Sequence, residues 1–464
     1  MISFDISLVT AWLWGGFIAL VSTLSAGHAL LNKRDPRSAV GWIAVCLFVP
    51  LIGAFFYFLL GVNRARRRAR KLKALGESPI DDGRYQVLGD APVHVAPDPL
   101  EGNAIETYLN GPDAYEAMLG AIAGARETVW LSQYIFEKRG VGGQFIDALG
   151  AAAARGARVR VLLDGVGALY ARGSTRRALI ALGVEVAMFA PPRLIPFQWA
   201  ANLRNHRKIL VVDGAVAFTG GMNIRPGYVP EDAGAPAKIK DSHFRFTGPV
   251  VQSLAAVFRD DWYLTTNTLL PLTPAATGEA AGDAHCRVTV DGPDNRVDLL
   301  TLVFQTAISS ARERVRIMTP YFLPPREIVS ALQAATLRGV VVDIVLPAHN
   351  NLPFVHWATR HLLPQLLQYG VRVSYQRGSF DHSKLLRVDE RFSVVGSANI
   401  DPRSLRLNFE VVVEAWSEHL AGDLDGYFDA RLADSDALDA AELSNASLPV
   451  RLRNAFSCLF MPYL

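Results

Sequence analysis

Two stretches of this chain carry the same polar residues at the same spacing, in a pattern suited to phosphate chemistry. The first, residues 205–223, reads NHRKILVVDGAVAFTGGMN, and the second, residues 381–399, reads DHSKLLRVDERFSVVGSAN. They align without a gap at an offset of 176 residues. The shared positions are His206, Lys208, Asp213, Gly220 and Asn223 in the first stretch and His382, Lys384, Asp389, Gly396 and Asn399 in the second. One HxK pattern carries little weight, but two copies in register predict a functional site.

The apolar residues between the histidine and the aspartate of each stretch predict a strand. Side chains alternate faces along a strand, so His206 and Lys208 share one face while Asp213 points the other way. The aspartate is therefore expected to support the site. The glycine turn that follows lets backbone approach a ligand closely, and the asparagine adds an amide donor. The predicted catalytic residues are His206, Lys208, Asp213, His382, Lys384 and Asp389, and the predicted substrate contacts are Gly221, Asn223, Ser397 and Asn399.

These residue types favour attack on a phosphate diester. A neutral imidazole can attack phosphorus covalently, while lysine and asparagine hold the nonbridging oxygens and offset charge in the transition state. One half-site lacks an acid for the leaving alkoxide, and a second, facing half-site supplies it. We assign His206 as nucleophile and His382 as general acid and base, although the near symmetry leaves the reverse assignment open. No metal or other cofactor is predicted.

The elements around these motifs also occur twice. Residues 127–136 (ETVWLSQYIF) predict a buried strand, residues 142–156 a helix, and residues 157–165 a second strand. Three segments of this region return in the same order later in the chain: residues 312–322 match 126–136, residues 337–347 match 154–165, and residues 369–376 match 182–189. The predicted fold is α/β, with two pseudo-symmetric domains that each hold a mixed β-sheet flanked by helices. The predicted domain boundaries are 85–271 and 285–435, separated by a small-residue stretch.

The N-terminal region is apolar enough to enter a membrane. Ile6 to Leu31 and Ser38 to Asn63 contain no Lys, Arg, Asp or Glu, and each is long enough to cross a bilayer. Residues 1–63 therefore predict a two-helix transmembrane hairpin, with a kink at Pro50. A basic linker follows at 64–84, with seven Lys and Arg between Arg64 and Lys73. The positive-inside rule then predicts that the linker and the two repeats are cytoplasmic.

Composition limits the remaining classes of function. The chain has 464 residues, half of them hydrophobic, and a net charge of only +3, which gives no support to nucleic-acid binding. The three cysteines are far apart, which argues against a disulfide framework or a cysteine zinc site. The C-terminal tail, residues 436–464, is apolar with arginines and is compatible with either a bilayer surface or docking on the core. Oligomeric state is left without a prediction.

At this point the sequence resembles the phospholipase D superfamily, whose HxK(x)4D motif occurs twice with a trailing G-[GS]-x-N. Within it, the chain is most similar to the bacterial cardiolipin synthases. The similarity extends to RDPRSAVGW and VPLIGAFFYFLLG near the N-terminus, and to FRDDWYLTTN, PYFLPP and GSANIDPRSLRLNFE.

The resemblance implies a metal-free reaction through a phosphohistidine. It also implies an acidic residue downstream of each motif that bonds a catalytic histidine, at Asp241 and Glu410 here. The implied reaction transfers a phosphatidyl group from one phosphatidylglycerol to another, giving cardiolipin and glycerol. Partners would be phosphatidylglycerol, other anionic phospholipids and the bilayer, at the bacterial inner membrane. The alternatives are a membrane-bound hydrolase of the same superfamily, either a phospholipase or a nuclease, and a catalytically inactive membrane scaffold.

Two residues depart from the family pattern. Asp381 precedes the second histidine, where relatives carry an apolar or amide residue. It either raises the pKa of His382 or faces solvent, and we favour solvent. Arg387 shares strand parity with Asp389 and is expected to pair with it.

Overall fold

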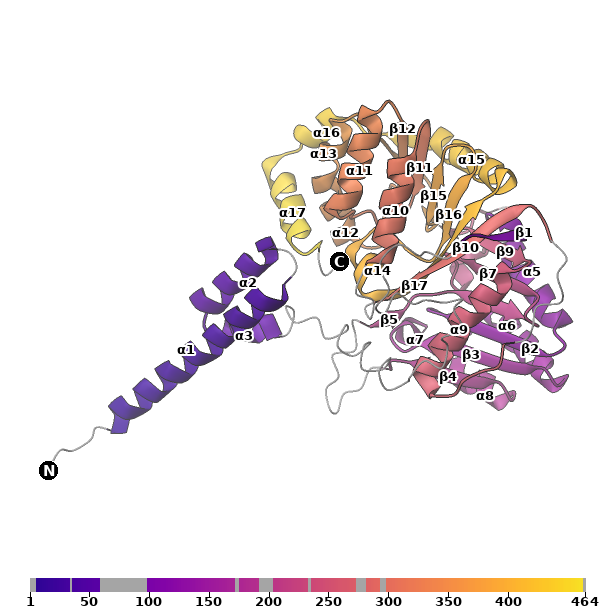
Figure 1. The fold of residues 1–464 in the computed structure, drawn as a ribbon, viewed down its shortest axis with the longest axis horizontal. Coiled ribbons are helices and arrows are strands. Elements are labelled where there is room, and N and C mark those ends of the chain that lie inside the picture. Colours follow the sequence, from indigo (N-terminus) through magenta and orange to yellow (C-terminus); the bar gives the residue numbers. More distant parts are fainter. Residues whose placement is uncertain are drawn as a thin grey trace. The chain divides into compact units, whose positions relative to one another are not determined.

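The computed structural model divides the chain into two compact units, an N-terminal unit from Met1 to Arg67 and a C-terminal unit from Arg68 to Leu464. The residues that the structure describes are 6–33, 36–58, 98–171, 175–191, 203–232, 235–272, 281–292 and 298–461. The predicted basic linker, 64–84, lies outside these residues. Each unit is described by itself below (Figure 1).

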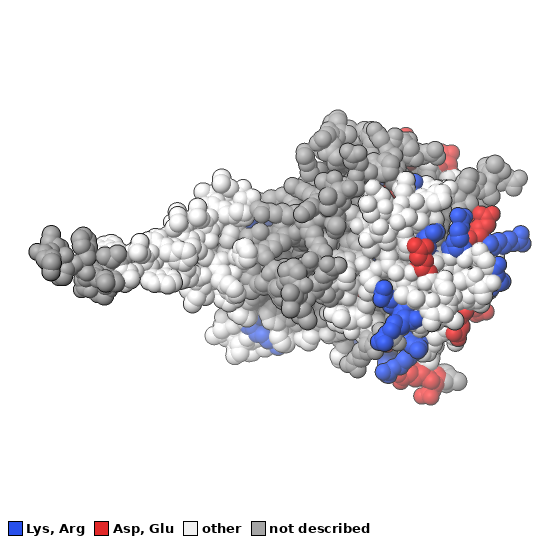
Figure 2. All heavy atoms as spheres, turned by 90° about the horizontal axis from the view of Figure 1, so that it is seen from below, with Lys and Arg blue, Asp and Glu red and all other residues white. Residues whose placement is uncertain are grey.

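The N-terminal unit holds one long apolar helix, α1 (Ile6–Asn32), followed by α2 (Pro36–Phe48) and the short α3 (Ile52–Phe56). Among the described residues, only α1 is long and apolar enough to cross a membrane, over Thr10–Asn32. The second predicted span is interrupted where Pro50 lacks a backbone N–H and Leu51 adopts a positive φ of 62°. The two-span hairpin is therefore not confirmed. On the face that Figure 2 shows, the described part of this unit is almost free of charged residues.

The C-terminal unit is built around one continuous sheet in which two similar halves meet. The first half runs in space as β1 (Leu100–Tyr108), β9 (His243–Thr247), β7 (Val216–Gly220), β6 (Ile209–Val212), β2 (Thr128–Gln133), β3 (Arg158–Asp164) and β4 (Glu185–Phe189). The second half repeats this order as β10 (Ala284–Asp291), β17 (Asn408–Trp416), β16 (Phe392–Gly396), β15 (Leu385–Val388), β11 (Arg314–Met318), β12 (Val341–Pro347) and β13 (Arg372–Gln376), with β18 (Ser435–Ala437) at the edge.

The pairing within the two halves confirms the predicted duplication. In each half, three strands run parallel, β2–β3–β4 and β11–β12–β13, and the motif strand β6 or β15 lies antiparallel to the first of them. Each half is thus a mixed sheet. The halves join where β1 pairs antiparallel with β10, so both repeats belong to one compact unit.

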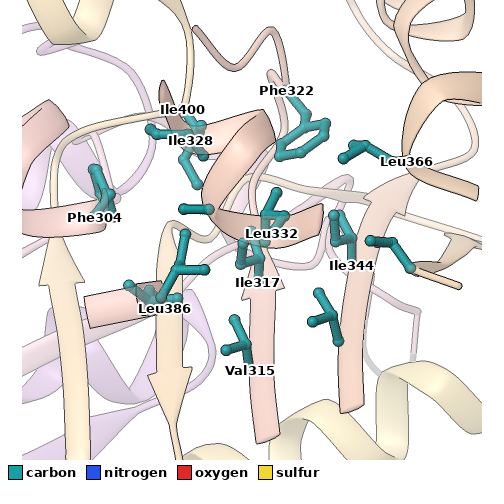
Figure 3. Packing of buried hydrophobic residues seen from close by; sticks show 14 of the residues in the cluster. Phe304, Val315, Ile317, Phe322, Ile328, Leu332, Ile344, Leu366, Leu386 and Ile400 are labelled. Atoms are coloured by element: carbon teal, nitrogen blue, oxygen red, sulfur yellow. The ribbon is translucent and has the colours of Figure 1, made fainter. Parts of the chain in front are cut away.

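Helices cover the sheet of each half, and each half has its own hydrophobic core. In the first half these helices include α5 (Gly111–Gly124), α6 (Val141–Ala154) and α9 (Val250–Thr266). In the second they include α10 (Leu299–Ser310), α11 (Arg326–Leu337), α12 (Pro353–Leu362) and α15 (Glu418–Ala433). Figure 3 shows the second core, in which Ile317 and Ile344 of neighbouring strands pack near Leu332 of α11. These rigid cores hold the motif strands in place.

Two very short strands cross between the halves next to the motifs. β5 (Arg204–Asn205) pairs parallel with β17 of the second half, and β14 (Phe380–Asp381) pairs parallel with β8 (Ile239–Lys240) of the first. β5 and β14 occupy equivalent positions, since each ends immediately before a motif histidine. The backbone just before each motif histidine therefore pairs with a strand of the opposite repeat.

Candidate active site

Both motif histidines line one cavity of about 1730 Å³ in the C-terminal unit. His206 and His382 are each 9% exposed, so their rings are nearly enclosed yet reach the cavity. The backbone N–H of His206 donates to the carbonyl of Phe409 at 2.9 Å, and that of His382 donates to the carbonyl of Lys240 at 2.7 Å. These bonds fix each histidine at the end of its crossing strand. Two residues far apart in the sequence thus meet at one site.

Each histidine bonds a carboxylate from the other repeat. Nδ1 of His206 lies 3.0 Å from Oε1 of Glu410, and Nδ1 of His382 lies 2.8 Å from Oδ2 of Asp241. The resemblance placed Asp241 and Glu410 against the histidines, but it did not indicate which carboxylate serves which histidine. The exchange follows from the crossing strands, because Asp241 follows β8 and Glu410 lies at the start of β17.

The two carboxylates differ in charge state. Burial raises the pKa of Glu410, but the neighbouring His206, Lys208 and Ser397 outweigh it, and the net pKa lies below its usual value. Ser397 donates to Glu410 at 2.5 Å and the amide of Asn408 donates at 3.0 Å, so donors surround an ionised group. Burial instead raises the pKa of Asp241 to about 7, against the lowering effect of Lys384.

The histidines themselves are held neutral near pH 7. Burial lowers the pKa of His206 to about 4 although Glu410 opposes it, and burial together with Lys384 lowers the pKa of His382 well below its usual value. A neutral imidazole carries one proton, and an ionised carboxylate facing Nδ1 draws that proton to Nδ1. Nε2 of His206 is then left with a free lone pair.

The two motif lysines are buried cations. Lys208 is 0% exposed, its Nζ donates to the carbonyl of His206 at 2.6 Å, and burial lowers its pKa to about 7. Lys384 is 4% exposed, its Nζ lies 2.9 Å from Nδ1 of His382, and burial also lowers its pKa. A buried ammonium is costly unless an anion compensates it. An anionic ligand at the histidines would provide that compensation.

Both motif asparagines line the same cavity, as the sequence predicts for ligand contacts. Oδ1 of Asn223 accepts from the backbone N–H of Ile135 at 3.1 Å, which fixes this side chain at the cavity. The amide of Asn399 donates to Oγ of Ser404 at 3.3 Å. The geometry thus brings His, Lys and Asn of both motifs together.

Gly221 and Ser397 lie behind the histidines and do not line the cavity, which corrects their prediction as substrate contacts. A Cβ built on Gly221 would lie 2.1 Å from Oδ1 of Asp241, so glycine makes room for that carboxylate. Ser397 is 0% exposed and bonds Glu410. Both residues act on the carboxylates, and only through them on the histidines.

Asp213 and Asp389 lie at the opposite end of the motif strands, which corrects their assignment as catalytic residues. Asp213 accepts hydrogen bonds from the backbone N–H groups of Arg126, Glu127 and Thr128, each at 2.8 Å. Asp389 binds the equivalent backbone segment at the start of β11, at 2.9–3.2 Å. Seven residues of extended chain separate each aspartate from its histidine, roughly 20 Å. In both motifs the aspartate therefore stabilises the fold by binding the backbone at the start of the neighbouring strand, β2 or β11.

The two residues that depart from the family pattern are buried and have partners on α15. Asp381 is 3% exposed and accepts from the hydroxyl of Tyr427 at 2.7 Å, so the expectation that it faces solvent is wrong. Its charge acts on the site by contributing to the raised pKa of Asp241. Arg387 forms its ion pair with Asp425 of α15, at 3.1 Å.

Several residues of the site carried no motif signal. The ring of Tyr134 meets that of His206 edge-on at 4.9 Å, and Tyr321 meets His382 in the same way at 6.2 Å. These tyrosines are equivalent in the two repeats, so the alignment of SQYIF with TPYF was the signal that could have identified them. The cavity is also rich in cations, with Glu137 and Asp401 as its acidic residues; its basic residues besides the histidines are Lys138, Arg139, Arg177, Arg204, Arg225 and Arg403.

Among the described residues, no group of three or more His, Cys, Asp and Glu side chains is placed to hold a metal ion. What the site does offer is two neutral imidazoles that line a cationic cavity, with a buried lysine against each of them. This combination, on a duplicated mixed sheet, defines a phosphodiester-processing protein of the phospholipase D type.

Comparison with known proteins identifies the family. The model for "Cardiolipin synthase, PLD-like domain" matches residues 118–262 and 304–432, and the model for "Phospholipase_D-nuclease N-terminal" matches residues 17–61. The chain belongs to the cardiolipin synthase family of the phospholipase D superfamily.

Relatives of this family match over most of the chain. A cardiolipin synthase of Oceanobacillus iheyensis is 30% identical over 98% of this chain and 100% of its own length. Cardiolipin synthase A of Pseudomonas aeruginosa is 32% identical over 90% of this chain and 89% of its own length. Among solved structures, phosphatidylserine synthase of Haemophilus influenzae is 15% identical and covers 78% of this chain and 95% of its own, with a TM-score of 0.60, which shows the shared fold.

Proposed function

We propose that this chain is a phosphatidyltransferase that makes cardiolipin. It transfers the phosphatidyl group of one phosphatidylglycerol to a hydroxyl of a second phosphatidylglycerol and releases glycerol. The observation that carries the proposal is the pair of histidines from two repeats on one cavity, each bonded to its own carboxylate and each next to a buried lysine. The relatives named cardiolipin synthase, similar over nearly the whole chain, support the choice of substrate.

The proposed first step is attack by Nε2 of His206 on phosphorus. A P–N bond forms and the P–O bond to the glycerol headgroup breaks. His382 gives the proton on its Nε2 to the leaving oxygen, and its Nδ1 takes up the proton of the Asp241 carboxyl in return. Glu410, held ionised, keeps the proton of His206 on Nδ1 and stabilises the positive charge that the ring gains. Lys208, Lys384 and the amide of Asn223 offset charge on the nonbridging oxygens.

The second step resolves the phosphohistidine. Nε2 of His382 now takes a proton from the hydroxyl of the second phosphatidylglycerol, and Nδ1 returns its proton to Asp241. The hydroxyl oxygen attacks phosphorus while the P–N bond to His206 breaks. The pair formed by His382 and Asp241 suits this double duty, because the pKa of Asp241 lies at about 7 and a proton is exchanged with little cost near neutral pH. The net cationic lining of the cavity fits two anionic headgroups.

A matched experiment tests the reaction. Phosphatidylglycerol vesicles labelled in the headgroup glycerol are incubated with the full-length protein, and the lipids are separated by mass spectrometry. Equal amounts of cardiolipin and free glycerol support the transferase. Phosphatidic acid as the sole lipid product would establish the alternative, a phospholipase D-type hydrolase, because water would then resolve the same intermediate.

The roles of the two histidines need a separate experiment. The reaction is quenched in acid, and the phosphorylated peptide is mapped. We expect phosphate on His206, with His206→Ala abolishing the signal. His382→Ala should slow both the formation and the decay of the phosphohistidine, because His382 transfers the proton in both steps. Phosphate on His382 in the wild-type protein would reverse the assignment.

The proposal also includes location and domain organisation. The apolar helix α1 and the inner-membrane setting of the family support membrane association. We place both apolar N-terminal segments in the inner membrane. The two phospholipase D-like repeats, 85–271 and 285–435, and the C-terminal tail that follows them, 436–464, lie on the cytoplasmic side. Labelling of single cysteines introduced in the exposed loops, in intact against permeabilised cells, tests this orientation.

A further inference from the structure

The C-terminal helix α17 (Leu448–Leu459) presents its apolar side chains outward and buries polar ones. Leu448, Leu452, Phe456 and Leu459 are 56–74% exposed and recur at intervals of four, four and three residues, which places them on one side of the helix. We call these four residues the α17 face. On the opposite side, Asn454 and Ser457 are 6% and 0% exposed. A helix of a water-soluble domain normally shows the reverse arrangement.

The orientation of α17 is fixed by its packing on α12 (Figure 1). The guanidinium of Arg453 lies over the ring of Trp357 at 4.5 Å, and the ring of Phe354 meets that of Phe460 edge-on at 5.7 Å. Because these contacts hold the polar side against the protein, the α17 face cannot turn inward without breaking them. The packing of α17 on α12 therefore keeps the α17 face exposed.

The helix α17 packs against residues that form the wall of the active-site cavity. Cys458, at the end of α17, packs against a small core that contains Leu323 and Val355, and both of these residues line the cavity. Leu352, at the start of α12, is 46% exposed and also lines the cavity. The cavity wall therefore runs outward into an apolar surface.

The other repeat contributes a second apolar edge to the same cavity. Leu169 and Tyr170, on the short helix α7 (Gly167–Tyr170), are 66% and 58% exposed and line the cavity. α7 follows β3 as the segment with Leu352 follows β12, so the two edges are equivalent in the two repeats. Exposed apolar side chains from both repeats therefore border the site. A single exposed apolar residue is common on protein surfaces, but several gathered around one cavity indicate a binding surface.

We propose that the α17 face and these two cavity edges dock the C-terminal unit on the surface of an anionic bilayer, so that lipid headgroups enter the cavity while their acyl chains stay in the membrane. This inference rests on the proposed function, since only a lipid substrate needs such a surface. α17 carries Arg451 and Arg453 and no acidic residue, and apolar side chains beside arginines are the composition that binds anionic interfaces. A second copy bound through the same face would bring like charges together.

The first test measures contact with lipid. In full-length protein lacking its native cysteines, Leu452→Cys is labelled with an environment-sensitive fluorophore and reconstituted into phosphatidylglycerol vesicles that contain brominated acyl chains. We expect brominated lipid to quench the fluorophore strongly. The matched control is Leu337→Cys, at the end of α11, which is 73% exposed and outside the patch, and we expect no quenching there. Equal quenching at both positions, or none at Leu452→Cys, overturns the proposal.

The second test measures the consequence for catalysis. The double variant Leu452→Glu and Phe456→Glu changes exposed residues that do not line the cavity. We expect turnover on phosphatidylglycerol vesicles to fall on the order of tenfold, because burial of even one such side chain is worth a factor of ten. Turnover of short-chain phosphatidylglycerol below its micellar concentration stays at the wild-type level. Leu337→Glu should match the wild type on both substrates.

The outcomes separate the two proposals. If the wild-type protein makes no cardiolipin from either substrate, the proposed function fails. If it makes cardiolipin and the double variant is as active on vesicles as the wild type, docking through α17 fails alone. Disulfide formation between two copies of Leu452→Cys, without quenching by brominated lipid, would instead assign the α17 face to a second copy of the chain and overturn the proposal.

Discussion

Replacing Glu410 by glutamine should cost the reaction about a hundredfold in turnover, although Glu410 belongs to the repeat opposite to the histidine it serves. The substitution keeps the size of the side chain and an oxygen that can accept from Nδ1 of His206. It removes the negative charge. The carboxylate is 0% exposed and held by donors from Ser397 and Asn408, so the loss of charge is not compensated by water.

The magnitude follows from the geometry. A unit positive charge on the His206 ring, 3.0 Å from the carboxylate, gains about 5 kcal/mol at an effective dielectric constant of about 20. If roughly half of that charge has developed on the ring in the transition state, the carboxylate contributes about 2.5–3 kcal/mol, or roughly a hundredfold in rate.

The assay is the initial rate of cardiolipin formation in phosphatidylglycerol vesicles, together with the yield of acid-trapped phosphoenzyme. Glu414→Gln is the matched control, because Glu414 is on the same strand, is 2% exposed and pairs with Arg287 away from the cavity. We expect Glu414→Gln to lower the unfolding temperature and to leave the turnover of folded protein within a factor of a few.

A Glu410→Gln protein with turnover close to wild type would refute the assignment of this carboxylate to the His206 ring. So would an equal loss in both variants, because that result would show a general effect of removing buried charge from β17. A selective loss of phosphoenzyme formation in Glu410→Gln is the signature of the proposed role.

Three further results follow from the same geometry. Asp213→Ala removes the acceptor of three backbone N–H groups and should lower the free energy of unfolding by about 2 kcal/mol, while turnover per folded molecule stays within a few fold, which chemical denaturation and active-site titration measure together. Gly221→Ala should abolish turnover while the protein stays folded, as circular dichroism and vesicle assays would show, since the added Cβ would meet the Asp241 carboxylate at 2.1 Å. The folded-state pKa of Asp241 is raised from 3.8 to about 7, so its contribution to stability is full below pH 3.8 and is lost as pH rises to about 7; Asp241→Asn should therefore flatten the decline of unfolding free energy across that window.

Much of the fold could be predicted from the sequence because its signals are local. The buried strand β2, the helix α6 and the strand β3 follow from runs of apolar residues with clear breaks between them, and their return in the second half indicated the duplication. The motif histidines, lysines and asparagines could also be identified, because the same residues return at the same spacing; the strands predicted to carry each His and Lys begin only after the lysines, at Ile209 and Leu385. Parity separated Asp213 from them, and the structure shows why: it binds the backbone at the far strand end.

What the sequence could not provide depends on contacts between distant segments. No local pattern indicates that β5 pairs with β17 and β14 with β8, so the exchange of carboxylates between the repeats was not predicted. Asp381 was expected in solvent, but Tyr427 and Arg431 of α15 cover it. The break at Pro50 was foreseen as a kink, whereas the helix ends there.

The differences between the half-sites give the duplicated site its direction. A symmetric pair of histidines would have no reason for one to attack and the other to transfer protons. Ser397 and Asn408 stabilise the charge of Glu410, whereas Gly221 offers no side-chain donor to Asp241, and the buried charge of Asp381 raises the pKa of Asp241 further. In the proposed mechanism, the ionised partner prepares His206 as a nucleophile, and the partner that titrates near neutral pH prepares His382 to give and take protons. If this reasoning holds, Ser397→Gly should raise the pKa of Glu410 and slow phosphoenzyme formation more than its resolution, which rapid acid quenching would measure; a change confined to resolution would contradict it.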